Sequence, residues 1–128
     1  MHALIIEDQF LVAALIEDVL RGLGYTSFDV VDREEDAVRA ARARCPDLVT
    51  ADHRLTCGSG VEAVRAICAT RAIPAVFIST YRAEILALLP DAIVITKPFG
   101  ERMLSEAVAA AGGSRPRGSR PETPEAEV

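Results

Sequence analysis

Several residues of this chain have the types and spacing that phosphate chemistry needs. Each follows a short apolar run directly: Glu7 and Asp8, Asp52, Ser79 with Thr80, and Lys97. The chain has 14 Lys and Arg residues, of which Lys97 alone is a lysine. Its compact ammonium suits one phosphoryl or carboxylate oxygen, whereas arginine presents a planar fork.

The three carboxylates predict a metal site if the fold brings them together. Carboxylates that share one crevice repel one another unless they share a cation. Oxygen ligands favour a hard divalent ion, and magnesium is usual where phosphate is handled. A simpler interpretation stays open, in which Glu7 and Asp8 only cap the first helix and Lys97 and Ser79 are ordinary strand-end residues. Asp52 fits this simpler interpretation less well, because this aspartate directly follows the strand-like run 48–51.

The elements that position these residues alternate along the chain. Short apolar runs, typical of strands buried on both faces of a parallel sheet, occupy residues 3–6, 27–31, 47–51, 74–78 and 92–95. Helical patterns follow them at about 10–22, 33–44, 60–69, 82–88 and 101–110. The alternation predicts a doubly wound α/β domain. Its ligand site lies beyond the carboxyl ends of the strands, where the candidate residues stand.

Two of the helical patterns are carried by apolar residues at helical spacing. The first helix is recognised from Phe10, Leu11, Ala14, Leu15, Asp18 and Val19, and Gly22 and Gly24 end it. The third has Val61, Val64, Ile67 and Cys68 on one face. The fourth pattern is barely two turns long and is therefore the weakest of the five.

Length and composition indicate one folded domain followed by a tail. A chain of 128 residues suffices for a single core. We predict the domain over residues 1–112 and a disordered tail over 113–128. From 114 onward the sequence has no large apolar residue except its final valine, so it cannot offset the entropy of ordering.

Several classes of protein are disfavoured by composition. No apolar stretch approaches the roughly 18–20 residues of a membrane span, and no basic segment of a signal peptide precedes the first strand. The spacing of Cys45, Cys57 and Cys68 fits neither a disulfide framework nor a zinc site. The net charge of −5 argues against a general nucleic-acid-binding surface. We therefore expect a cytoplasmic protein with reduced thiols that binds neither nucleic acid nor membrane.

Five motifs, in order and at matching spacing over about residues 2–111, resemble the receiver domain of two-component response regulators. They are Leu4-Ile5-Ile6-Glu7-Asp8, the segment 46–52, Gly58 with Gly60, the segment 74–79, and Lys97-Pro98-Phe99. The resemblance implies the flavodoxin-like receiver fold: a five-stranded parallel sheet of order 2-1-3-4-5, flanked by five helices.

The resemblance also implies a site and its chemistry. Asp52 would accept a phosphoryl group from a histidine kinase or a phosphotransfer protein, by in-line transfer to an ionised carboxylate. Magnesium would be held by Glu7, Asp8, Asp52 and the backbone carbonyl of Arg54. Lys97 would contact a phosphoryl oxygen. The Ser79 hydroxyl would hydrogen-bond the phosphoryl group and draw its loop inward.

Three residues near the implied phosphoryl group are expected to modulate its lifetime. Thr80 stands where receivers usually carry alanine or glycine, and its branched side chain is predicted to crowd the path to Asp52 and slow phosphorylation or hydrolysis. Arg54 lies two residues after Asp52, and Tyr81 lies two after Ser79. A guanidinium at this place holds the phosphate or steers the attacking water, and the sequence leaves both open.

The switch region departs from the family pattern in two further ways. Val94 stands three residues before Lys97, where many receivers carry an inward-turning aromatic residue. Ser79 and Lys97 are only 18 residues apart, so the fourth helix is predicted to be short or irregular. The run 77–81 with such a helix resembles stand-alone and anti-sigma-antagonist receivers of alphaproteobacteria.

Four other residues carry predictions of their own. His53 adjoins Asp52 on a strand, so its side chain should point to the opposite side, packed or hydrogen-bonded rather than bound to metal. His2 is predicted to be idle near the terminus. The resemblance implies a cis bond before Pro98, and Phe99 is predicted to anchor the core.

The sequence therefore predicts a single-domain response regulator that changes its protein contacts on phosphorylation. It would not be an enzyme beyond its own phosphorylation and dephosphorylation, its output protein is left unnamed, and a homodimer stays possible. One rival is a phospho-independent interaction module that keeps the fold without the switch. A second is a small aspartate-nucleophile phosphatase, which needs a general acid where Arg54 stands.

Overall fold

The computed structural model describes residues 1–112, in which strands and helices alternate as predicted. In chain order the elements are β1 (His2–Ile6), α1 (Phe10–Gly22), β2 (Ser27–Val31), α2 (Glu34–Ala43), β3 (Leu48–Ala51), α3 (Gly60–Ile67), β4 (Ala75–Ser79), α4 (Arg82–Leu88), β5 (Val94–Thr96) and α5 (Glu101–Ala111). For most of the strands, at least one predicted end differs from the observed end by one or two residues. The predicted tail, 113–128, lies outside the described residues.

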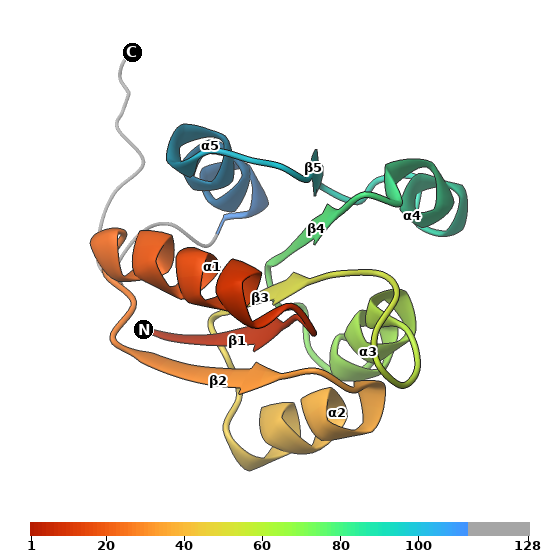
Figure 1. Ribbon diagram of the computed structural model, residues 1–128. Coiled ribbons are helices and arrows are strands. Elements are labelled where there is room, and N and C mark those ends of the chain that lie inside the picture. Colours follow the sequence, from red (N-terminus) through yellow and green to blue (C-terminus); the bar gives the residue numbers. More distant parts are fainter. Residues whose placement is uncertain (113–128) are drawn as a thin grey trace.

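The five strands form one parallel sheet in the order β2-β1-β3-β4-β5, which confirms the predicted fold (Figure 1). The order reverses between β1 and β3, so the loops that follow these strands diverge and leave a crevice between them. Ile6 pairs with Ala51 in register. Glu7 and Asp52, the next residue of each strand, are therefore brought side by side.

Helices cover both faces of the sheet, because the central strands β1, β3 and β4 are buried along nearly their whole length. Figure 1 shows α1 and α5 on one face and α2, α3 and α4 on the other. The first layer buries Ile16 and Leu20 of α1 against Leu104 of α5, and the second layer includes Val61 of α3 and Ile85 of α4. Ile85 is the buried residue of α4, so this seven-residue helix is lightly anchored.

Helix α1 forms where predicted, but of the apolar residues that predict it only Val19 is buried. Phe10 and Leu11 are 83% and 80% exposed, and Leu15 is 46% exposed. The buried side of α1 consists of Ala13, Ile16, Val19 and Leu20. The segment carries two apolar stripes at helical spacing, and only docking on the sheet decides which one is covered.

The prediction that His2 is idle is wrong, because β1 begins at this residue. Its ring is buried, with Nδ1 at 2.8 Å from Ser27 Oγ and Nε2 at 2.9 Å from Asp29 Oδ2. The His2 backbone N–H also donates to Asp47 Oδ2 at 2.7 Å, and the Asp47 N–H donates back to the His2 carbonyl. These bonds tie β1 to the edge strand β2 and to the entry of β3.

Candidate functional site

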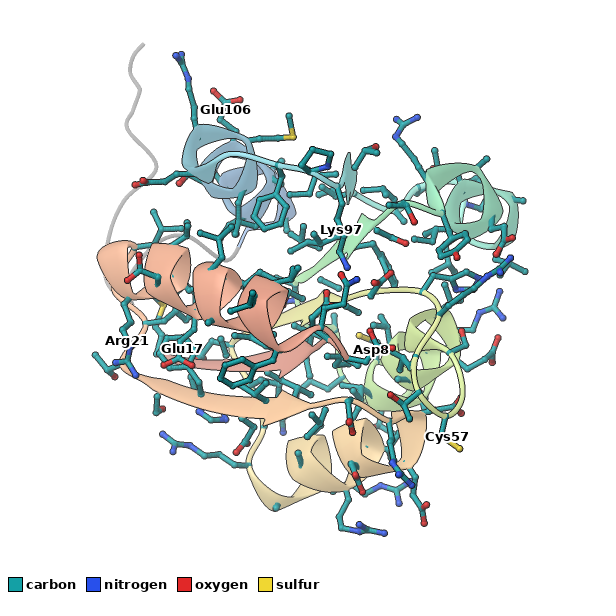
Figure 2. All side chains as sticks on the ribbon, viewed as in Figure 1. Asp8, Glu17, Arg21, Cys57, Lys97 and Glu106 are labelled. Atoms are coloured by element: carbon teal, nitrogen blue, oxygen red, sulfur yellow. The ribbon has the colours of Figure 1, made fainter. Side chains whose placement is uncertain are left out.

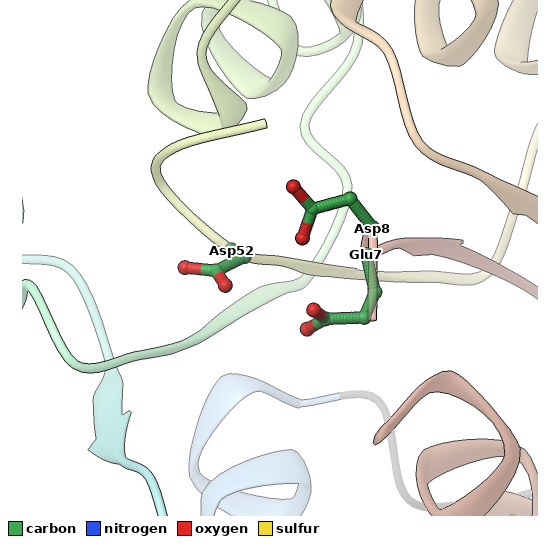
Figure 3. Close-up of side chains that lie close together, drawn as sticks. All are labelled: Glu7, Asp8 and Asp52. Atoms are coloured by element: carbon green, nitrogen blue, oxygen red, sulfur yellow. The ribbon is translucent and has the colours of Figure 1, made fainter. Parts of the chain in front are cut away.

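The carboxyl ends of two strands bring the predicted acidic residues together. Glu7 and Asp8 follow β1, and Asp52 follows β3. One carboxylate oxygen from each lies within 4.8 Å of the other two, and their side chains face a common space (Figure 3). Glu7 and Asp52 are buried, whereas Asp8 is exposed at the rim. The crevice that the sequence predicts is therefore present, with one carboxylate open to solvent.

Lys97 enters this crevice from the end of β5 (Figure 2). Its ammonium lies 2.7 Å from Asp52 Oδ2 and 3.1 Å from each carboxylate oxygen of Glu7. It also donates to Gln9 Oε1 at 2.9 Å. Gln9 was missed by the sequence reasoning, because a single glutamine in a loop carries no signal until the fold places it opposite Lys97.

The charges of the crevice do not balance. Three carboxylates face one ammonium, and the pKa of Glu7 is raised because burial outweighs the hydrogen bonds from Lys97 and from the Gln9 N–H. Burial alone lowers the pKa of Lys97, but hydrogen bonds to Asp52 and Glu7 reverse the sign and raise it. The lysine therefore stays protonated beside an excess of negative charge.

The donor set fits a hard divalent cation. Glu7 Oε1 is buried and has no hydrogen-bond partner among the described residues, although it lies at ion-pair distance from Lys97. A buried carboxylate oxygen without a hydrogen bond is costly unless another group meets it. Three carboxylates, one of which has a buried oxygen that accepts no hydrogen bond, match the oxygen ligands that Mg²⁺ prefers.

The loop after β3 holds Asp52 in place. The Asp52 Oδ1 atom accepts from the His53 N–H at 2.6 Å, while Oδ2 faces Lys97. The Gly60 N–H donates to the His53 carbonyl at 2.7 Å, and a Cβ at Gly60 would stand only 1.6 Å from the Asp52 carbonyl oxygen. Glycine is required there because the start of α3 approaches the backbone of the phosphoacceptor candidate closely.

Ser79 is fully buried at the end of β4, beside the crevice. Its hydroxyl oxygen accepts from the Tyr81 N–H at 2.9 Å, which closes a tight turn around the exposed Thr80. A serine hydroxyl can accept one hydrogen bond and still donate its own proton. The predicted bond to a phosphoryl oxygen therefore remains available, and the predicted crowding by Thr80 stays a prediction.

Two of the expected modulators, Arg54 and Tyr81, lie in one cluster beside the site. Arg54 Nη2 pairs with Glu84 Oε2 of α4, and the Arg54 guanidinium stacks 4.0 Å above the centre of the Tyr81 ring. Glu84 Oε1 lies 3.1 Å from His53 Nε2. The hydrogen bond from Arg54 lowers the pKa of Glu84, and the same bond raises the pKa of Arg54. Glu84 is a second residue that the sequence reasoning missed.

Four further predictions near the site are confirmed. The His53 side chain is only 12% exposed and its Nδ1 atom lies 3.4 Å from Ser59 Oγ, so this histidine is hydrogen-bonded rather than free. The Lys97–Pro98 bond is cis, and Phe99 packs against the core layer under α1 and α5. The fourth helix is short, as the spacing from Ser79 to Lys97 predicts.

The fold and the crevice are those of a receiver domain, and the comparisons agree. The chain matches the response regulator receiver domain over residues 3–109. It belongs to that family.

Individual relatives are similar over most of the chain. The phyllosphere-induced regulator PhyR of Methylorubrum extorquens is 35% identical over 112 residues, which cover 84% of this chain and 42% of PhyR. The solution NMR structure of the Erythrobacter litoralis PhyR REC domain has a TM-score of 0.79 and 30% identity, covering 90% of this chain and 93% of that domain. A crystal structure of the anti-anti-sigma factor PhyR from Bartonella quintana has a TM-score of 0.74 and 29% identity, covering 86% and 46%.

The chain thus spans less than half the length of the curated relative that it matches. Its similarity to PhyR lies in the receiver part, as the high mutual coverage with the isolated REC domain indicates. Within residues 1–112, no helix combines the length and the apolar character that crossing a membrane requires.

Proposed function

We propose that Asp52 is phosphorylated by a histidine kinase or a phosphotransfer protein, with Mg²⁺ held by Glu7, Asp8, Asp52 and the backbone carbonyl of Arg54. One observation carries the proposal: three carboxylates converge within 4.8 Å while Lys97 bridges Glu7 and Asp52. This is a set of groups for binding a cation and a phosphoryl oxygen together.

Each residue of the site has a separate role in an in-line phosphoryl transfer. A carboxylate oxygen of Asp52 bonds to phosphorus while the bond from phosphorus to the donor's histidine nitrogen breaks, and the nitrogen keeps the electron pair. When bound, Mg²⁺ supplies charge neutralisation for the carboxylates and the phosphoryl oxygens. Lys97 pairs with a phosphoryl oxygen, and the Ser79 hydroxyl donates to another while still accepting from Tyr81.

The signal leaves the molecule through protein contacts. Receiver domains are signalling modules rather than enzymes of metabolism, and we propose that this chain acts in the cytoplasm by phosphorylation-dependent binding or by competing for and relaying phosphoryl groups. PhyR of Bartonella quintana is an anti-anti-sigma factor. We propose that this chain serves the same kind of regulatory system, with an output protein still to be identified.

The two rival functions have less support. The phosphatase reading needs a general acid two residues after the nucleophile, where Arg54 keeps its proton and is paired with Glu84. A phospho-independent module does not require three carboxylates to converge beside a single ammonium, an arrangement that favours a bound cation.

The test is phosphate incorporation from acetyl phosphate or phosphoramidate, followed by intact mass with and without Mg²⁺. We expect one added phosphoryl group on the wild-type chain, lost in Asp52→Asn and kept in Asp91→Asn, an exposed aspartate in the loop before β5. No incorporation into the wild type from either donor or from a candidate kinase would favour the phospho-independent module. Turnover of phosphate esters would favour the phosphatase.

A further inference from the structure

Glu84 contacts His53 and Arg54, the two residues that directly follow the phosphoacceptor candidate Asp52. Its Oε1 atom lies 3.1 Å from His53 Nε2, and its Oε2 atom accepts from Arg54 Nη2. His53 and Arg54 belong to the loop after β3, whereas Glu84 lies in the first turn of α4. A single carboxylate therefore ties the loop that carries the site to the helix beyond β4.

Arg54 is paired with Glu84 and is close in sequence to a second acidic residue, Asp52. It lies two residues from Asp52, and its guanidinium is stacked on Tyr81 at 4.0 Å. The Arg54 and Glu84 side chains are 58% and 45% exposed, so solvent weakens their ion pair. Guanidinium binds phosphate oxygens through two parallel hydrogen bonds, which makes a phosphoryl group the stronger competitor.

Lys97 also pairs with the phosphoryl group in the proposed transfer, but among the described residues none of its hydrogen bonds goes to α4. Its ammonium already contacts Asp52, Glu7 and Gln9 inside the crevice. Among the described residues, Arg54 is the exposed cation nearest in sequence to Asp52. Its present partner belongs to the lightly anchored α4, which buries Ile85 alone.

We propose that Glu84 is a positioning residue that holds Arg54 in the unphosphorylated protein, and that a phosphoryl group on Asp52 takes Arg54 from it. The exchange breaks the bond between Arg54 and Glu84 and leaves Glu84 with His53 alone. The first turn of α4 is then held less tightly to the loop, so that occupancy of the site changes the surface of that helix. This inference rests on the proposed phosphorylation of Asp52, and it adds the route by which the modification reaches α4.

The test compares Glu84→Gln with the matched variant Glu62→Gln. Glu62 also lies in the first turn of a helix and pairs with an arginine, Arg65 at 2.6 Å, but it touches neither loop residue. The readouts are the phosphorylation rate from phosphoramidate by intact mass and hydrogen exchange of α4 before and after phosphorylation. Glu84→Asp, with a shorter reach, is the conservative control.

We expect Glu84→Gln to phosphorylate roughly two- to fivefold faster than wild type, because Arg54 is free to meet the incoming phosphoryl group. Its α4 should exchange fast already before phosphorylation and change little afterwards. Glu62→Gln should behave as wild type. Glu84→Asp should give a phosphorylation rate and an exchange rate of α4 between those of wild type and of Glu84→Gln. Adding Arg54→Gln to Glu84→Gln should abolish the gain in rate, which a merely structural role of Glu84 does not predict.

The outcomes separate this inference from the function on which it rests. A wild-type chain that takes no phosphoryl group overturns both. A wild-type chain that is phosphorylated on Asp52, with Glu84→Gln matching it in rate and in the exchange of α4, overturns the role of Glu84 and leaves the proposed function standing. A gain in rate that survives Arg54→Gln also overturns it.

Discussion

The two ends of the sheet hold polar clusters of opposite character. At the amino end lies what we call the amino-edge cluster, in which Ser27, Asp29 and Asp47 each bind His2, and both nitrogens of the buried His2 ring have partners. At the carboxyl end, which we call the carboxyl-edge site, Glu7, Asp8, Asp52 and Lys97 meet with more negative than positive charge and with one buried oxygen lacking a hydrogen bond.

The difference separates a structural cluster from a binding site. Polar groups that serve the fold alone are expected to satisfy one another, because an unpaired buried group costs stability. A cluster that stays unbalanced is retained where a ligand completes it, and perturbed charges gather at such sites. The buried histidine, which sequence reasoning set aside, belongs to the first kind, and the buried Glu7 belongs to the second.

The largest expected loss of stability comes from adding a side chain at Gly60, where α3 begins close to the carboxyl-edge site. Gly60→Ala places a methyl carbon 1.6 Å from the Asp52 carbonyl oxygen, so the backbone must move. We expect a loss of about 3 kcal/mol or more in the free energy of unfolding, measured by urea titration. Gly22→Ala is the control near the amino edge, where nothing lies within 4 Å of the new carbon. It should be neutral or stabilising by up to about 1 kcal/mol, and equal losses in both variants would contradict the steric argument.

Filling the carboxyl-edge site should stabilise the protein. At a free Mg²⁺ concentration one hundred times its Kd, the free energy of unfolding should rise by about 2.7 kcal/mol, which thermal melts with Mg²⁺ or EDTA would detect. Asp8→Asn should lose most of this gain while folding normally, because Asp8 is exposed. Asp91→Asn should keep it. A gain that survives Asp8→Asn would place the ion elsewhere.

Breaking the amino-edge cluster should cost stability without touching magnesium. His2→Ala leaves the hydroxyl of Ser27 and the carboxylate of Asp29 without their ring partners, and we expect a loss of about 2 kcal/mol. Thr26→Ala, in the exposed connection before β2, is the control. The shift in melting temperature caused by Mg²⁺ should be the same in His2→Ala as in wild type. A smaller shift would mean that the two ends of the sheet are coupled.

The smallest effect concerns Tyr25, which is buried near the amino edge with its hydroxyl unpaired among the described residues. Burial and then the charge of Asp47 raise its pKa to about 12. The unfolded chain loses this proton near pH 10 and the folded protein only near pH 12, so stability falls as pH rises between these values. Tyr25→Phe should be nearly neutral at pH 7 and should flatten this decline, measured by urea unfolding at several pH values. An unchanged slope would place the alkaline sensitivity elsewhere.

Much of the site could be read from the sequence, because strand ends are marked by composition. Apolar runs followed at once by Glu7, Asp52, Ser79 and Lys97 place each residue at the carboxyl edge of a parallel sheet, and the structure brings them there. Gln9 and Glu84 could not be found in the same way. Each acquires its role from a partner far along the chain, Lys97 and Arg54 respectively, and a lone polar residue in a loop or exposed helix has no local signature.

The covered face of α1 illustrates the same limit for packing. Helical spacing predicts the helix, but Phe10, Leu11 and Leu15 lie at the surface while Ala13 and Ile16 face the sheet. Before the helix docks on a partner surface, the free energies of burying one or the other of its two apolar stripes differ little. Docking against β1 and α5 decides between them, since only one stripe can meet the core at close packing.

By itself the sequence determined the class of fold, the strand ends that carry chemistry and the acidic, cation-binding character of the site. These follow from local patterns: runs that are apolar on both faces, helix-ending glycines and the residue types after each strand. The tertiary structure decided which carboxylate is buried and which is exposed, that Lys97 spans Glu7, Asp52 and Gln9, and that Glu84 holds Arg54. Burial and pairing depend on side chains that are distant in sequence, so no local pattern could have fixed them.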